Sequence, residues 1–479
     1  MRMKGLAMKT KRRWLLALAA GGLLLIAAGA AAFYVKARRP VTTSSKAAYE
    51  AYEEAVANEE RFYFKEARLG FARAVELDPT FAMAMLGLAR QSPDQEQRKT
   101  LVRRAAKERA HLTERERYHV EIQLAGVENR TADVLRLAHE AHAKFPEDVR
   151  TAEIIAMEQM GKGNPDEAMR VFQEVLSVDP NNAQAYNQIG YRFGYQGDYQ
   201  KALDNLEKYR FIAPDTANPF DSLGEVQAYS GHYPEAIENL NHALAIKPDF
   251  VPSQKNLGVV YEGMGDYRKA IEAYERAAQL TDKPDERRGL LTLALRAAIN
   301  DGDAALIREK LARIAALPAN PKDDFAEERR TTLRLVELDL EGKQAEVQRE
   351  LVGMLPGLQR KWEKAKKQGE YLPNMKPHFR EWNWLMARSL EKQGRADEAM
   401  KYCALNANPP NPFFDFESRR WIMEARAKLA ELVARKGDLD RAEKLLAENR
   451  KWNPSWAPCR PSEVIVAQLR HDRVLAAAK

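Results

Sequence analysis

The chain has 479 residues, of which 30% are charged and only two are cysteines, Cys403 and Cys459. The formal net charge of +7 is unevenly distributed: residues 1–39 contain nine Lys and Arg and no acidic residue, which leaves 67 basic and 69 acidic side chains in the rest. The high isoelectric point therefore reflects the N-terminal segment and gives no support to nucleic-acid binding. Two cysteines exclude a disulfide-rich scaffold. Because they fall in different predicted helical units, two inert thiols are favoured over a bridge between them.

An uncharged stretch at residues 14–35 is long enough to cross a membrane. Its 22 residues would extend about 33 Å as a helix, against a hydrocarbon thickness of about 30 Å. Six basic residues precede it and three follow it. This difference predicts a short cytoplasmic segment at residues 1–13, a transmembrane signal anchor at 14–35 in the inner or plasma membrane, and residues 40–479 in the periplasm or outside the cell. The alternative is a secreted protein whose signal peptide is cleaved at the small residues 28–30.

A 34-residue repeat runs through the middle of the chain. A proline, a glycine, an alanine and a large apolar residue each recur at this spacing. Four positions that share one period indicate an array of similar structural units. The series are Pro146, Pro180, Pro214 and Pro248; Gly163, Gly197, Gly231 and Gly265; Ala168, Ala202, Ala236 and Ala270; and Phe172, Leu206, Leu240 and Tyr274.

Each period predicts two helices. In residues 183–214, apolar side chains at helical spacing form the stripe of a first helix, Gly197 interrupts it, and a second helix follows and ends at Pro214. The small residues Gly190 and Ala202 allow the two helices to approach closely. One such pair cannot bury its apolar face alone, so stability must come from stacking on the neighbouring pairs.

This pattern resembles the tetratricopeptide repeat. Residues 251–282 match the signature of that family, and residues 217–248 match it with Gln227 in place of the usual aromatic residue. The resemblance implies an all-α fold, a right-handed α-solenoid of about eleven helix pairs. The matching residues in 251–282 are Leu257, Gly258, Tyr261, Gly265, Tyr267, Ala270, Tyr274 and Ala277.

The repeat register extends in both directions with weaker matches. It predicts an N-terminal array at residues 40–318, strongest at 149–282, and C-terminal repeats with a capping helix at 380–479. Between them, residues 319–379 are predicted to form an irregular helical segment that ends in a proline-containing hinge.

No catalytic or metal-binding motif stands out. The sequence has neither a phosphate-binding loop nor a nucleophile elbow. His139 and His142 could share a helix face, but the third ligand is absent and the register places them on the outside of a second helix, so solvated histidines are favoured. We therefore expect no enzyme, no cofactor and no metal. The alternative is an enzymatic site in the irregular region 319–422.

The resemblance also implies where a partner binds, because the first helices of this family line a concave groove. The groove positions combine tyrosines, acids and an amide, which suits recognition of a peptide or protein segment. Carried onto this sequence, they are Asn187, Tyr191, Tyr195, Asp221, Glu225, Tyr229, Lys255 and Glu262. A second candidate surface, near the C-terminus, contains Trp384, Phe413 and Phe414.

These features predict a membrane-tethered, extracytoplasmic scaffold that binds another protein in its groove. The alternative is a cell-envelope assembly or maturation factor that uses the same groove for defined clients. The sequence leaves open the identity of the partner, the oligomeric state, and whether the chain's own loops occupy the groove.

Overall fold

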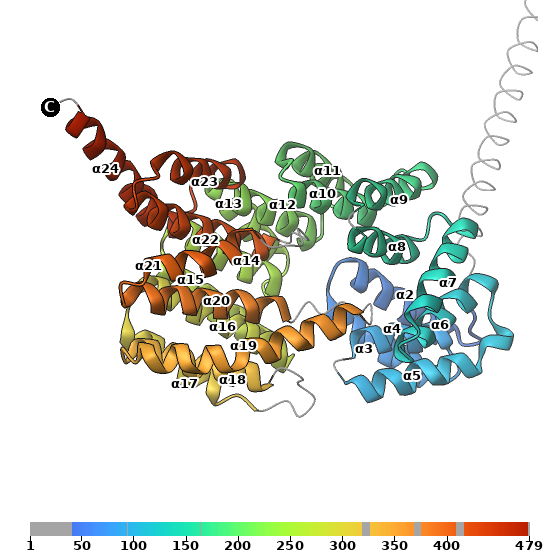
Figure 1. The fold of residues 1–479 in the computed structure, drawn as a ribbon. Helices are drawn as coiled ribbons and strands as arrows, with labels where there is room; N and C mark the ends of the chain where they lie inside the picture. The colour runs from blue at the N-terminus through green and yellow to red at the C-terminus, as the bar shows by residue number, and fades with distance from the viewer. Residues whose placement is uncertain are drawn as a thin grey trace, which may run out of the picture. The chain divides into compact units, whose positions relative to one another are not determined.

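The computed structural model describes residues 41–477 apart from 93, 163, 319–325, 368–374 and 409–415. Within these residues the protein has 23 α-helices, two short 3₁₀ helices and no strand (Figure 1). The helices form two units, Met1–Leu137 and Ala138–Lys479, and each has its own apolar core.

The predicted membrane segment at residues 14–35 lies outside the described part of the chain, as do Phe413 and Phe414. Among the residues that are described, no helix has the length and apolar character needed to span a membrane.

The first unit is built on a small aromatic core. The ring of Tyr52 lies 5.7 Å from that of Phe71 and 4.9 Å from that of Phe81. Glu116 is buried and accepts hydrogen bonds from the backbone N–H and the hydroxyl of Thr42, both at 2.7 Å, which ties residue 42 to a helix 74 residues later. The helices here are α2 (Lys46–Glu60), α3 (Phe64–Leu77), α4 (Ala82–Gln91), α5 (Gln95–Lys107), η1 (Arg109–His111) and α6 (Glu114–Val127), and α7 (Thr131–Lys144) crosses into the second unit.

The second unit holds the remaining helices. They are α8 (Val149–Gly161), α9 (Pro165–Val178), α10 (Ala183–Gln196), α11 (Tyr199–Ile212), α12 (Ala217–Ser230), α13 (Tyr233–Ile246), α14 (Val251–Met264), α15 (Tyr267–Leu280), α16 (Pro284–Asp301), α17 (Ala304–Ala315), α18 (Ala326–Leu340), α19 (Gln344–Lys367), α20 (Met375–Lys392), α21 (Ala396–Ala407), α22 (Phe416–Arg435), α23 (Leu439–Trp452), η2 (Ala457–Cys459) and α24 (Arg460–Ala477). Along the described chain, α2 to α23 make eleven consecutive pairs in chain order, of which all but α6 and α7 pack closely, and α24 packs against α22 and α23 at the end. The prediction of an all-α, solenoid-like array of helix pairs is confirmed.

The recurring glycine makes the turn between the two helices of a pair. Gly197, Gly231 and Gly265 end α10, α12 and α14 with φ values of 88°, 87° and 86°. This left-handed conformation places the Cβ of an L-residue against its own backbone, so glycine is favoured there. The backbone requirement explains why glycine recurs every 34 residues.

In the pairs α12–α13 and α14–α15, a second glycine sets the distance between the helices. A Cβ added at Gly258 would lie 2.4 Å from the ring of Tyr274, and one added at Gly224 would lie 2.6 Å from Leu240. Tyr274 and Leu240 are fully buried. In these pairs the large apolar residue of the second helix therefore packs directly on the glycine of the first helix.

The segment predicted to be irregular contains two regular helices, α18 and α19. Helix α19 extends over 24 residues with Pro356 inside it, and this length moves the sequence out of the 34-residue register. Helix α20 begins at Met375, within the predicted hinge. The two units divide after Leu137, a position inside the predicted array at 40–318. The apolar residues of α2–α6 form one core and those of α11–α24 another.

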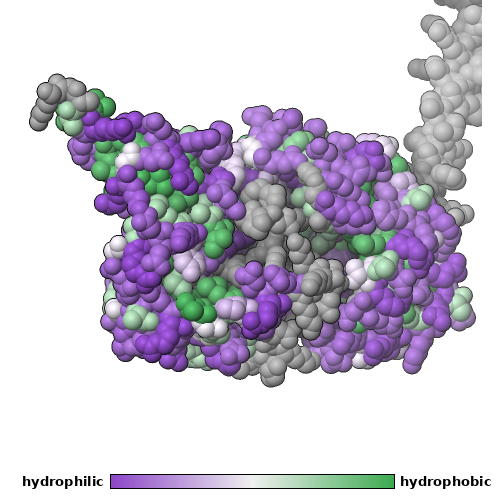
Figure 2. Space-filling model, in the orientation of Figure 1, coloured by the Kyte–Doolittle hydropathy of each residue, from purple (hydrophilic) through white to green (hydrophobic). Residues whose placement is uncertain are grey.

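Within the second unit, the end of the array returns to its beginning. Helix α22 lies beside α14 in Figure 1, and its side chains contact α10, α12 and α14. One continuous apolar core consequently includes both Ala202 and Val466. The face of this unit seen in Figure 2 is largely hydrophilic, so most of its apolar side chains are used between helices.

Candidate binding groove and central cavity

All eight predicted groove residues lie on the first helices α10, α12 and α14. Asn187, Asp221, Tyr229 and Glu262 are buried, and Tyr191, Tyr195, Glu225 and Lys255 are partly buried. The structure therefore brings the set together on one side of the array. Much of this face is covered by the chain's own helix α22.

Phe416, the first residue of α22, fills the aromatic part of the groove. Its ring stacks on Tyr229 with centroids 4.4 Å apart and planes inclined by 11°, and it meets the edge of Tyr195 at 4.9 Å. The ring of Tyr191 lies 6.2 Å away. Three of the tyrosines predicted to recognise a partner thus form a socket for a residue of the same chain.

Arg419 binds the C-terminal end of α10. It is 2% exposed and donates hydrogen bonds to the Gly194 carbonyl at 3.1 Å, to the Tyr199 hydroxyl at 2.9 Å, and to the Tyr195 carbonyl. The last carbonyls of a helix lack partners within the helix and carry partial negative charge, so a guanidinium satisfies them well.

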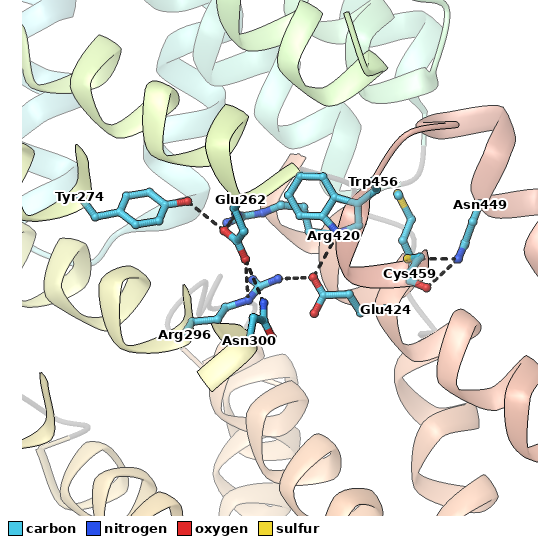
Figure 3. A network of polar contacts seen from close by, with 10 residues as sticks. Glu262, Tyr274, Arg296, Asn300, Arg420, Glu424, Asn449, Trp456 and Cys459 are labelled. Carbon is cyan, nitrogen blue, oxygen red and sulfur yellow. Dashed lines mark hydrogen bonds and ion pairs between the residues drawn. The ribbon is translucent and has the colours of Figure 1, made fainter. Parts of the chain in front are cut away.

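Arg420 enters a buried network of charges (Figure 3). It donates to Glu262 at 2.9 Å, and Tyr274 donates its hydroxyl to the same carboxylate at 2.9 Å. Arg296 lies 3.5 Å from Glu262 and bonds Glu424 at 2.5 Å, and Trp456 donates its indole N–H to Glu424 at 3.2 Å.

This network is held together by charge balance, since two guanidiniums face two carboxylates. Burial raises the pKa of Glu424, and Arg296 opposes that rise. Glu262 is fully buried. Removing one partner of a buried ion pair typically costs about 3–5 kcal/mol, so α22 is bound to α14 by interactions that are costly to break.

Asp221, Glu225 and Lys255 take part in contacts between neighbouring first helices. Asp221 accepts hydrogen bonds from Ser253 at 2.8 Å and Asn256 at 3.1 Å. Burial, together with the negative charge of Glu225, raises the pKa of Asp221 to about 7. The Tyr191 hydroxyl donates a hydrogen bond at 2.7 Å to one carboxylate oxygen of Glu225. The other oxygen of Glu225 lies 3.8 Å from the Lys255 ammonium.

The residues of α22 that enter the groove were not predicted from the sequence. They are Phe416, Arg419, Arg420 and Glu424. The sequence feature that could have indicated them is the adjacent pair Arg419 and Arg420. Neighbouring residues on a helix point about 100° apart, so two adjacent arginines can contact two different helices. Nothing local showed that these helices would be α10 and α14.

Apart from the face that α22 covers, the first helices line a half-open cavity of about 720 Å³, here called the central cavity. Its wall comes from α14, α16, α18, α20 and α22 with the end of α17, and it includes the predicted residues Lys255 and Trp384. The apolar part of the wall contains Leu290, Leu293, Ile299, Leu333, Val336, Trp384, Leu385 and Trp421.

Charged side chains also face the central cavity. Arg288, Arg296, Arg329, Glu381, Glu417 and Glu424 all contribute to the wall. Burial, together with the negative charge of Glu417, raises the pKa of Glu381 to about 7. Guanidiniums in an otherwise apolar wall can form charge-assisted hydrogen bonds with an ionic group.

Trp382 and Trp384, two residues apart on α20, have different surroundings. Trp382 is fully buried and donates its indole N–H to the Thr332 hydroxyl at 2.9 Å. Trp384 is partly buried and lines the central cavity, with the guanidinium of Arg388 5.3 Å from its ring.

Both cysteines are free and buried, which agrees with the prediction of unpaired thiols. Burial raises the pKa of Cys403 to about 12, so this thiol is unreactive at neutral pH.

One prediction about the histidines is wrong. His139 is half exposed, and its Nε2 lies 2.7 Å from the Glu158 carboxylate. His142 is buried, not solvated, because it lies against the next pair, with its Nε2 3.3 Å from Glu174. Within the described residues no group of His, Cys, Asp or Glu has the arrangement of a metal site.

Two segments match family models of the tetratricopeptide repeat, residues 150–182 and residues 251–280. These segments correspond to α8–α9 and α14–α15. The chain therefore contains tetratricopeptide repeats, as the sequence pattern indicated. No curated protein matches the sequence.

Several solved structures resemble parts of the array. A crystal structure of MamA is 25% identical and covers 34% of this chain and 92% of its own, with a TM-score of 0.28. MamA 41-end from Desulfovibrio magneticus RS-1 is 22% identical over 35% of this chain and 93% of its own, with a TM-score of 0.29. The APC/C hetero-tetramer Cut9-Hcn1 is 15% identical over 88% of this chain and 75% of its own, with a TM-score of 0.47.

Proposed function

We propose that the protein is a membrane-tethered, extracytoplasmic scaffold that binds another protein through the first helices of its tetratricopeptide repeats. The observation that carries the proposal is the series of first helices with tyrosines and charged groups on one side. Side chains of this kind give rigid contact area together with hydrogen bonds, which suits protein recognition.

Part of this surface is not covered by α22. It lies on α8 and the neighbouring part of α10, which precede in the chain the tyrosines that contact Phe416. Met157 occupies on α8 the position that Tyr191 occupies on α10, and its side chain is 57% exposed. Methionine adapts its shape to different apolar partners. Gln188 donates to Glu153 at 2.9 Å and joins the two helices beside it. We therefore assign the partner contact to α8–α10.

Site-specific crosslinking in the native membrane tests this assignment. A photoreactive amino acid at Met157 should capture one protein reproducibly. The matched control is the same amino acid at Val178, an apolar residue that is 52% exposed at the end of the second helix of the same pair. Equal products from both positions, or none from Met157, would reject the groove as the contact surface.

A further inference from the structure

The central cavity has the size and walls of a small-molecule site. Its volume of about 720 Å³ falls within the range of about 300–1,000 Å³ that is typical of ligand pockets. Aliphatic and aromatic side chains make most of the wall, among them Leu293, Leu333 and Trp421. Such a surface favours a hydrocarbon over water.

The polar atoms of the wall that lack partners are hydrogen-bond donors. Arg288 keeps a buried Nε–H without an acceptor, although its Nη2 donates to the Pro318 carbonyl at 2.6 Å. The Nη1 atom of Arg296 is likewise buried and has no acceptor. Among the described residues that line the cavity, no carboxylate, hydroxyl or amide oxygen is both buried and without a partner. The missing group is therefore an acceptor, and for a guanidinium the strongest acceptor is an anion.

The two arginines offer different surroundings to such an anion. Arg296 already faces Glu262 and Glu424, so a second anion there would be repelled. Arg288 lies near a second guanidinium, that of Arg329. Burial and then the positive charge of Arg288 lower the pKa of Arg329, and the carboxyl groups of Asp285 and Glu381 offset only part of this shift. An anion beside Arg288 would relieve this repulsion.

The neutral polar groups of the wall are already engaged, which disfavours a peptide. Asn300 donates to Glu262 at 3.4 Å, Thr292 donates to the Arg288 carbonyl at 2.9 Å, and Thr332 accepts from Trp382. A peptide backbone entering the cavity would bury N–H and C=O groups without partners, at a cost that an alkyl chain does not incur.

We propose that the central cavity binds an amphiphile with an alkyl body and a carboxylate head. The carboxylate accepts hydrogen bonds from Arg288 beside Arg329, and the alkyl chain lies along α16 toward Trp421. Arg288 and Arg296 are eight residues apart, about 12 Å along the helix, which leaves room for an extended chain between the two guanidiniums.

Fluorescence titration of the full chain in lipid nanodiscs tests the proposal, with empty nanodiscs as the blank. The probes are bromine-labelled dodecanoic acid and the corresponding bromine-labelled alcohol. The acid should quench tryptophan emission with at least tenfold higher affinity than the alcohol, because only the acid carries the anion. The Trp384→Phe, Trp421→Phe double variant should lose this quenching, since both rings line the cavity.

Three variants separate this site from general hydrophobic binding. Arg288→Met should weaken the acid about tenfold and leave the alcohol unchanged, while Leu333→Trp should fill the cavity and weaken both. Arg349→Met, an exposed arginine on α19, is the matched control and should change neither. Circular dichroism melting confirms that each variant is folded.

Several results would overturn the proposal: equal affinity for acid and alcohol, no effect of Arg288→Met in a folded variant, or binding of an apolar peptide where the acid does not bind. Crosslinking at Met157 tests the protein partner and is independent of the fluorescence titration. If no partner is captured at Met157, the affinities measured for the acid and the alcohol still decide the present proposal.

Discussion

Asp221 shows how a single buried carboxyl makes the groove sensitive to pH. Its pKa is raised from 3.8 to about 7 by burial and by Glu225, so the folded protein holds the proton more tightly than the unfolded chain does. The stability that this proton contributes is greatest below pH 4 and is lost as the pH rises to about 7. Asn at this position would keep an oxygen acceptor for Ser253 and Asn256 without the charge.

We expect Asp221→Asn to stabilise the protein by roughly 1–3 kcal/mol at pH 8 and to have little effect at pH 4. Thermal unfolding midpoints measured between pH 4 and pH 8 check this. The matched control is Asp204→Asn, an exposed aspartate on the second helix α11, which should leave the pH profile unchanged. A variant that is less stable than the wild type at pH 8 would show that the Asp221 charge is used in the groove.

At the scale of helices, the sequence predicts what a repeat determines within itself. The glycine turns at Gly197, Gly231 and Gly265 and the packing of Tyr274 on Gly258 are contacts within one or two neighbouring helices, so a 34-residue pattern contains them. The contact of Arg420 with Glu262 joins residues 158 positions apart. Each helix pair is rotated slightly relative to the pair before it, and the sum of these rotations between α14 and α22 decides whether the two helices meet. A pattern within one repeat does not specify that sum. For the same reason the repeat register assigned Glu262 to a first helix, but it did not identify Arg420 as the residue that faces Glu262.

Arg420→Met tests whether α22 holds this part of the array together. The substitution leaves Glu262 buried with one guanidinium in place of two, at an expected cost of about 3–5 kcal/mol. Hydrogen–deuterium exchange should then become faster in α10, α12, α14 and α22 together, because these helices share the network and the Phe416 socket. Helices α2–α5, which have a separate core, should be unchanged.

The control for Arg420→Met is Arg435→Met on the same helix. Arg435 pairs with Glu431 at 3.0 Å but is 54% exposed, so its loss should cost no more than about 1 kcal/mol. If exchange becomes faster only in α22 after Arg420→Met, then α22 packs against α10, α12 and α14 without stabilising them, and the prediction is wrong.

For the whole molecule, the asymmetry of charge around residues 14–35 determines how the array would be oriented at a membrane. Six basic residues before the apolar stretch and three after it favour retention of the N-terminus in the cytoplasm. The proposed scaffold requires it, because partners of residues 40–479 would then be extracytoplasmic proteins.

Protease protection in intact cells and spheroplasts tests the orientation. Protease added outside spheroplasts should digest residues 40–479, and protease confined to the cytoplasmic side of inverted vesicles should leave them intact. Replacing Lys4, Lys9, Lys11, Arg12 and Arg13 by Gln leaves Arg2 before the stretch against three basic residues after it, so this variant should insert partly in the opposite orientation. Digestion of the wild-type array from the cytoplasmic side would reject the topology, and a mature N-terminus just after residues 28–30 would show a cleaved signal peptide in place of an anchor.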